Sequence, residues 1–291
     1  MTETATAFHG IESLPVPRLS LEEFTAWGRQ AIIRADVPMV VDLLPEVDPG
    51  VRRDAMLEKL GDSNVALFTK KRSPGNDQRA VVTKIRLRDF FDQEMYNTHT
   101  DGSYRIVSNI KNRPDAIDHI LGFDALQMFD YQAPLNSANI WVSYNGLLGR
   151  NHFDEFENFN IQLEGRKRFI MLPPGYKNYY IRSVLQGYGH HSKARRVDNL
   201  DPRRFPRLVA MLAQRRDIVL EPGQMLYLPL GWWHQVDGLD RVNININVWL
   251  RDQKIFRRPY VLGDALYKAA FRRLNGFYDY QAEKSHAGSE K

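Results

Sequence analysis

The stretch 243–249 constrains the fold more than any other part of the chain. Asparagines stand at 243, 245 and 247, and each is followed by an apolar residue: Ile244, Ile246 and Val248. Successive side chains of a strand point to opposite faces, so one face of this strand is polar and the other apolar. Asparagine is disfavoured in an ordinary surface strand. Three in register therefore predict a sheet whose polar face lines the interior of a barrel.

The whole region from Asn139 onward has the texture of an antiparallel barrel or sandwich. Short apolar runs follow one another closely and are separated by Gly and Pro. Residues 159–163 and 168–172 flank Glu164-Gly165, and we expect them to form a hairpin. A strand at 217–220 leads through Glu-Pro-Gly into another at 225–229.

Helices are expected on both sides of this region. Ser20-Leu21-Glu22-Glu23 has the Ser-x-x-Glu form of a capping box and opens an amphipathic helix that should end before Pro38. The remaining expected elements are helices at 51–60, 87–94, 119–129 and 260–274 and strands at 38–44 and 65–69.

One short motif carries the chemistry. In Asn151-His152-Phe153-Asp154-Glu155 the His and Asp lie two residues apart, so both side chains point to one face of a strand. His234, far downstream, completes a set of two imidazoles and one carboxylate. Such a facial triad suits a non-haem Fe(II) centre, because it leaves half of an octahedral sphere open. His190 and His191 have no partner at ligand spacing and are interpreted as surface or structural residues.

Bulk properties narrow the alternatives. The 291 residues suit one catalytic core with helical additions. Because the chain has no cysteine, disulfides and thiolate metal sites are excluded. No apolar run approaches the roughly 20 residues that cross a bilayer, and the N-terminus is not a secretory signal, so a cytoplasmic protein without a membrane partner is expected. The net charge of +5 is concentrated at 190–216, which is either a solvated surface or a docking surface for an acidic partner.

Lys167 is a second candidate site residue. It should point to the same face of its strand as Phe169, with Arg166 and Arg168 on the other face. A lysine inside a barrel is costly unless an anion neutralises it, so an inward Lys167 implies a bound carboxylate. The alternative is a solvent-facing lysine in a run of three basic residues.

These motifs together resemble a known family. Residues 151–159, 165–174 and 226–236 closely resemble the cupin-like JmjC hydroxylases, the group that includes the asparaginyl hydroxylase acting on hypoxia-inducible factor and small bacterial relatives. The resemblance covers roughly 15–250 and is strongest over 139–249. It implies Fe(II) bound by His152, Asp154 and His234, with 2-oxoglutarate as cosubstrate.

The resemblance also assigns the cosubstrate pocket. Lys167 matches the family's lysine that pairs with the distal carboxylate of 2-oxoglutarate, and Asn158 and Asn247 match asparagines that line the pocket. The family's threonine just before the triad has no counterpart, because Gly149 stands there. Either another hydroxyl such as that of Tyr144 completes the carboxylate site, or the site has none.

The implied fold is mainly β: a double-stranded β-helix, the jelly roll of cupins, with N-terminal and C-terminal helices. We expect a disordered N-terminus at 1–14, the N-terminal part of the JmjC-like domain at 15–135 and the barrel core at 136–252 with a basic insertion at 176–216. A C-terminal helical region at 253–281 and a disordered tail at 282–291 complete the chain. The C-terminal helix either packs on its own barrel or forms a homodimer interface.

The function implied is that of a dioxygenase that hydroxylates an unactivated C–H bond on a peptide or protein side chain. The same chemistry on a small molecule or on RNA stays open. RNA ranks lower because the basic stretch lacks the aromatics of a base-stacking platform. A non-oxidative metal-binding cupin, either an isomerase or a ligand-binding module, is the alternative of a different class.

Overall fold

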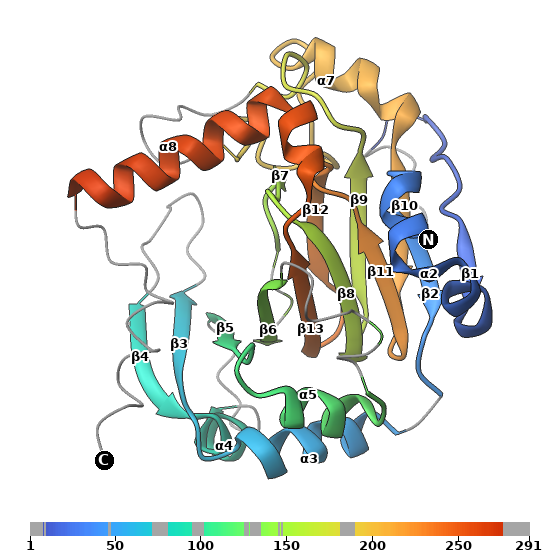
Figure 1. The fold of residues 1–291 in the computed structure, drawn as a ribbon. Helices are drawn as coiled ribbons and strands as arrows, with labels where there is room; N and C mark the ends of the chain where they lie inside the picture. Colours follow the sequence, from blue (N-terminus) through green and yellow to red (C-terminus); the bar gives the residue numbers. More distant parts are fainter. Residues whose placement is uncertain are drawn as a thin grey trace.

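Two facing β-sheets form the centre of the molecule (Figure 1). The computed structural model describes residues 8, 10–45, 48–71, 81–94, 102–124, 128, 135–144, 146, 148–180 and 190–275. The larger sheet has nine strands in the order β1-β2-β11-β8-β13-β6-β5-β3-β4, and the smaller has four in the order β10-β9-β12-β7. Strands from the N-terminal part of the chain therefore extend both edges of the barrel's larger sheet.

From β6 onward the chain passes repeatedly from one sheet to the other, and only β9 and β10 follow one another within the same sheet. Those of the larger sheet are β1 (Arg18–Ser20), β2 (Met39–Asp42), β3 (Asn64–Lys71), β4 (Val81–Arg86), β5 (Gly102–Asn109), β6 (Leu135–Tyr144), β8 (Glu157–Glu164), β11 (Gln224–Leu228) and β13 (Val242–Leu250). Those of the smaller sheet are β7 (His152–Phe153), β9 (Lys167–Leu172), β10 (Arg216–Leu220) and β12 (Trp233–Gly238).

Helices cover the sheets from outside. They are α2 (Leu21–Ala35), α3 (Pro49–Leu60), α4 (Leu87–Asp89), a π-helix at Phe90–Glu94, α5 (Pro114–Leu121), α7 (Pro206–Met211), 3₁₀ turns at Leu212–Gln214 and Gln253–Arg257, and α8 (Pro259–Asn275). No helix in the described part of the chain is long and apolar enough to span a bilayer.

The hairpin predicted around Gly165 is wrong. β8 pairs with β11 and β13, whereas β9 pairs with β10 and β12, so the chain passes from one sheet to the other at this turn. Gly165 has φ +68°, and a Cβ at this position would lie 2.0 Å from the carbonyl oxygen of Val242. The Glu-Gly signal marks a tight turn correctly, but a jelly roll uses that turn as a corner between sheets.

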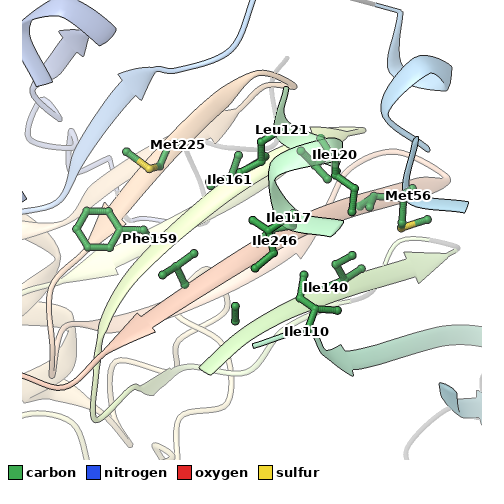
Figure 2. Close-up of a cluster of buried hydrophobic side chains, with 14 of the residues drawn as sticks. Met56, Ile110, Ile117, Ile120, Leu121, Ile140, Phe159, Ile161, Met225 and Ile246 are labelled. Carbon is green, nitrogen blue, oxygen red and sulfur yellow. The ribbon is translucent and has the colours of Figure 1, made fainter. Parts of the chain in front are cut away.

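The apolar face of the larger sheet packs against helices, as the alternation in 243–249 predicts. Ile244, Ile246 and Val248 belong to the main core cluster with side chains from α2, α3 and α5. Figure 2 shows Ile117 and Ile120 of α5 directed toward the strands that carry Ile140 and Ile246. The asparagines of β13 consequently face the space between the sheets.

The interior between the sheets also has an apolar part. Phe169 and Met171 of β9 meet Leu226 and Leu228 of β11 in one buried cluster. This contact closes one end of the interior with hydrocarbon, so the polar side chains gather in the remainder.

Local helix signals are confirmed in one place and wrong in another. Ser20 and Glu23 form the predicted capping box of α2, although Gly28 (φ 72°) interrupts the helix. The helix predicted at 119–129 is instead α5, because Pro114 occupies its first turn and Gly122 ends it in the left-handed conformation.

The chain termini differ in what the structure describes. Within 1–14, Phe8 is buried, and the centroid of its ring lies 3.7 Å from the guanidinium carbon of Arg215. Leu14 N donates to Arg215 O at 2.7 Å. The described part of this segment is thus packed on the barrel, which differs from the expected disorder. The predicted C-terminal helix is present as α8, while the tail 282–291 lies outside the described residues.

Candidate metal centre

Two neighbouring strands and one turn bring the predicted triad together. His152 of β7 pairs directly with His234 of β12, and Asp154 follows β7. One ligand atom from each residue lies within 4.8 Å of the other two. Nε2 of His152 is 4.0 Å from Oδ1 of Asp154, and Nε2 of His234 is 3.7 Å from Oδ2. This donor set suits a divalent transition metal.

Backbone carbonyls orient both imidazoles. Nδ1 of His152 donates to Arg150 O at 2.7 Å, and Nδ1 of His234 donates to Trp232 O at 3.0 Å. With the proton on Nδ1, each ring presents the lone pair of Nε2 to the centre of the triad. Burial, together with the nearby His152, lowers the pKa of His234 to about 4, so this ring is neutral at pH 7.

The third ligand is held by an amide. Asn158 Nδ2 donates to Oδ2 of Asp154 at 3.0 Å, and the carbonyl oxygen of Asp154 accepts from Gly231 N at 2.9 Å. The carboxylate is therefore fixed by a side chain and its backbone by the loop that precedes β12. Partners of this kind orient metal ligands in proteins.

A chain of buried amides continues from Asn158 into the barrel. Its Oδ1 accepts from Asn160 at 3.0 Å and from Asn247 at 3.1 Å. Asn245 in turn donates to Asn160 at 3.1 Å and to Asn247. All four asparagines are buried, which confirms the polar interior predicted from the alternation in β13.

Lys167 terminates this chain. Its Nζ donates to Oδ1 of Asn245, while Arg166 pairs with Asp240 and Arg168 with Asp217 on the other side of the strand. Of the two directions that the sequence left open for Lys167, the structure shows the inward one. Burial lowers the pKa of its ammonium to about 7, and no carboxylate among the described residues pairs with it.

The structure does not bring Tyr144 to this interior. Its side chain belongs to the core under the helices, with Ile140 and Val142 of the same strand face, and its hydroxyl accepts a hydrogen bond from Arg241 Nε. Gly149 cannot be replaced by the family's threonine without movement, because a Cβ would lie 2.3 Å from the carbonyl oxygen of Val236.

Two histidines set aside in the sequence lie beside the triad. His191 forms a bridge with His152, and their rings are stacked at 5.6 Å. The ring of His190 lies 4.0 Å from that of His191, and its Nδ1 is 3.8 Å from Asp264 of α8. No motif spacing could have identified these two histidines, because their position beside the triad depends on the pairing of His191 with His152. Asn160, by contrast, shares the alternation of Asn158 and was recognisable.

The basic insertion is partly structural. Arg196 binds Asp198 and Asp237, and Gln235, next to the triad's His234, also donates to both carboxylates. Arg196 thereby ties the insertion to β12. Lys193, Arg203, Arg204 and Arg207 are exposed.

Comparison with known proteins places the chain. The cupin-like domain profile matches residues 39–254. Human HSPB1-associated protein 1 is 27% identical over 166 residues, 55% of this chain and 32% of the human protein. Lysine-specific demethylase JMJ31 of Arabidopsis thaliana is 26% identical over 125 residues, 43% of this chain and 23% of that protein. The chain spans about a third or less of the length of these relatives.

Among solved structures, that of Escherichia coli ycfD is similar with a TM-score of 0.44 and 21% identity, covering 83% of this chain and 56% of that one. The family profile, by contrast, covers every strand from β2 to β13 and all three residues of the triad. The chain belongs to the cupin-like domain family.

Proposed function

We propose that this protein is an Fe(II)- and 2-oxoglutarate-dependent dioxygenase that hydroxylates an unactivated C–H bond of a peptide or protein side chain. The observation that carries the proposal is the connection of Lys167 to Asp154 through buried asparagines within one interior. A metal centre and a buried cation in the same space suit a cosubstrate with a chelating end and an anionic end.

The residues present fit Fe(II). Ligand atoms of two imidazoles and one carboxylate lie within 4.8 Å of one another, and these are the donors of facial-triad oxygenases. His152, Asp154 and His234 would hold the ion and leave its opposite side for cosubstrate and dioxygen. When bound, the iron supplies dioxygen activation coupled to oxidative decarboxylation of 2-oxoglutarate to succinate and carbon dioxide.

The interior also fits a dicarboxylate. Lys167 donates to the amide oxygen of Asn245, and burial disfavours its charge. A carboxylate beside it would restore the ammonium form through a charge-assisted hydrogen bond. Asn158 and Asn247 would line the space between that carboxylate and the metal, where their amides orient the bound molecule.

The relatives support a protein substrate. One of them is named as a protein associated with HSPB1, and another is named as a lysine-specific demethylase. Hydroxylation of a carbon next to nitrogen is also the first step of oxidative demethylation, so the same centre could serve either outcome. We favour stable hydroxylation, and a cytoplasmic location stays a prediction.

The test is to incubate the Fe(II)-loaded protein with 2-oxoglutarate and a peptide library, amino acids or RNA, and to follow succinate and product mass. A gain of one oxygen on a peptide supports the proposal, whereas loss of a methyl group with formaldehyde indicates demethylation. Metal binding without any 2-oxoglutarate consumption, with Asp154→Ala as the control, would favour a non-oxidative cupin.

A further inference from the structure

His152 is the more exposed of the two histidines of the triad. Its side chain is 27% exposed, whereas that of His234 is 3% exposed. It also stands in β7, a strand of only two residues. The hydrogen bond from Nδ1 to Arg150 O holds the tautomer only while the ring keeps the tilt that directs Nδ1 at that oxygen. A contact that limits the tilt therefore also preserves the tautomer.

Two rings enclose the His152 imidazole. The ring of His234 lies at 4.2 Å and is tilted by 52°, while the ring of His191 lies at 5.6 Å and is nearly parallel, with an interplanar angle of 20°. His191 is outside the cluster of ligand atoms found among the described residues. It contacts a ligand of the proposed metal through the His152 ring.

The backbone places His191 with little freedom. Phe153 N donates to His190 O at 3.0 Å, and Ser192 N donates to Asn151 O at 3.1 Å. These bonds add residues 190–192 to the edge of β7 that β12 leaves open. The stack between His152 and His191 thus follows from strand pairing and does not depend on a mobile side chain alone.

A second layer supports the His191 ring from behind. The ring of His190 packs on it at 4.0 Å, and Asp264 of α8 lies next to His190. Lys268, one turn along α8, binds Asp264 at 2.7 Å and Glu155 at 3.2 Å. Helix α8 consequently reaches both the histidine pair and the residue next to Asp154.

We propose that His191 is a positioning residue: its ring holds the imidazole of His152 at the tilt that directs Nε2 to the metal. The inference rests on the proposed function for the identity of the bound metal. The orientation of the His152 ring does not depend on that identity. A ring of the same shape should serve, because the contact is a stack.

The experiment compares His191→Ala and His191→Phe with His119→Ala, a control at a histidine on α5 that pairs with Glu58. Mn(II) is titrated into each full-length protein by calorimetry, and thermal melts are recorded in parallel. We expect His191→Ala to weaken Mn(II) binding ~10-fold, in the range typical of residues that orient ligands. His191→Phe and His119→Ala should stay within about twofold of the original protein.

A second readout needs no metal. Nitrogen NMR of the His152 imidazole reports whether the proton stays on Nδ1. We expect the Nδ1–H form in the original protein and in His191→Phe, and a mixture of tautomers in His191→Ala. This measurement separates the inference from the proposed function, because it is decided even if the protein never consumes 2-oxoglutarate.

Unchanged Mn(II) affinity together with an unchanged tautomer in His191→Ala would overturn the proposal. Equal damage in His191→Phe would overturn it as well, since a polar contact of the imidazole would then matter and not the stack. If His191→Ala also fails to fold, the His191→Phe comparison still decides between ring shape and polarity.

Discussion

Oδ2 of Asp154 accepts a 3.0 Å hydrogen bond from Nδ2 of Asn158, which is itself the acceptor for Asn160 and Asn247. The carboxylate proposed to bind the metal is therefore the end of a buried amide network. Replacing Asn158 with Ala should weaken Mn(II) binding ~10-fold, because the carboxylate loses the partner that orients it. Calorimetric titration checks this, with exposed Asn109→Ala as the control. Unaltered affinity would show that the loop backbone alone orients Asp154.

Asp154→Ala should abolish tight metal binding and turnover, since only the two imidazole donors would remain. Metal content after dialysis and succinate production measure the two effects. Undiminished turnover in this variant would contradict the assignment of the triad.

Lys167→Met should raise the Michaelis constant for 2-oxoglutarate far more than it changes metal affinity. The lost charge-assisted interaction contributes roughly 2 to 4 kcal/mol in a desolvated site, which corresponds to about 30-fold or more. Steady-state kinetics at fixed Fe(II) checks the expectation. Arg166→Met is the matched control, because Arg166 points away from the interior and binds Asp240.

Cosubstrate affinity should also depend on pH. Burial lowers the pKa of Lys167 to about 7 in the free protein, so the ammonium form that attracts a carboxylate is depleted as pH rises above that value. The apparent affinity should fall by up to ~10-fold per pH unit from pH 7 upward, until the pKa of the complex is passed. Binding of 2-oxoglutarate measured between pH 6 and 9 tests this expectation. In Lys167→Met the affinity for 2-oxoglutarate should not change over this pH range.

The buried pair Glu157–Lys254 predicts a stability effect. Glu157 is fully buried and lies 2.8 Å from Lys254 Nζ and 2.6 Å from the hydroxyl of Tyr227. Lys254→Met should destabilise the fold by about 3–5 kcal/mol, because it leaves a buried carboxylate unpaired. The double variant with Glu157→Gln should recover most of the loss in urea unfolding.

The sign of the pH dependence of stability in Lys254→Met follows from the same pair, Glu157–Lys254. Burial raises the pKa of Glu157, and Lys254 lowers it, so removing Lys254 raises the pKa further. In Lys254→Met the folded state then favours the protonated carboxyl. The stability of this variant should be highest below the unfolded pKa and fall as pH rises through the folded pKa. A loss of stability in Lys254→Met that grows toward low pH would contradict this expectation.

Truncation after Gln253 should give insoluble protein. It removes the partner of Glu157, the ion pair of Arg258 with Asp36 and the fully buried Val261. Truncation after Ala270 keeps these contacts and should stay soluble. Light scattering of the full-length protein then tests whether α8 forms a dimer, and a monomeric state would remove that hypothesis.

Much of the local structure was predictable because its causes are local. The capping box at Ser20, the alternation of β13 and the His-x-Asp spacing each depend on residues a few positions apart. Backbone periodicity decides which of these side chains share a face. The same periodicity placed Lys167 on one face with Phe169 but left open whether that face points inward, and the resemblance to the family supplied its expected role.

Other features could not be read from neighbouring residues. Gly165 looks the same whether the next strand folds back or crosses to the second sheet, and only the pairing of β8 with β11 and β13 decides between them. Tyr144 was a reasonable hydroxyl donor by sequence position, but the pleat of β6 turns it toward the helices.

The sequence by itself determined the donor types, their spacing and the polar face of the barrel strands, because these depend on residue chemistry and on the period of a strand. The tertiary structure decided that His191 returns to stack on His152 and that α8 reaches Glu155 through Lys268. Both contacts join segments separated by long stretches of chain, and their positions result from the packing of the whole barrel.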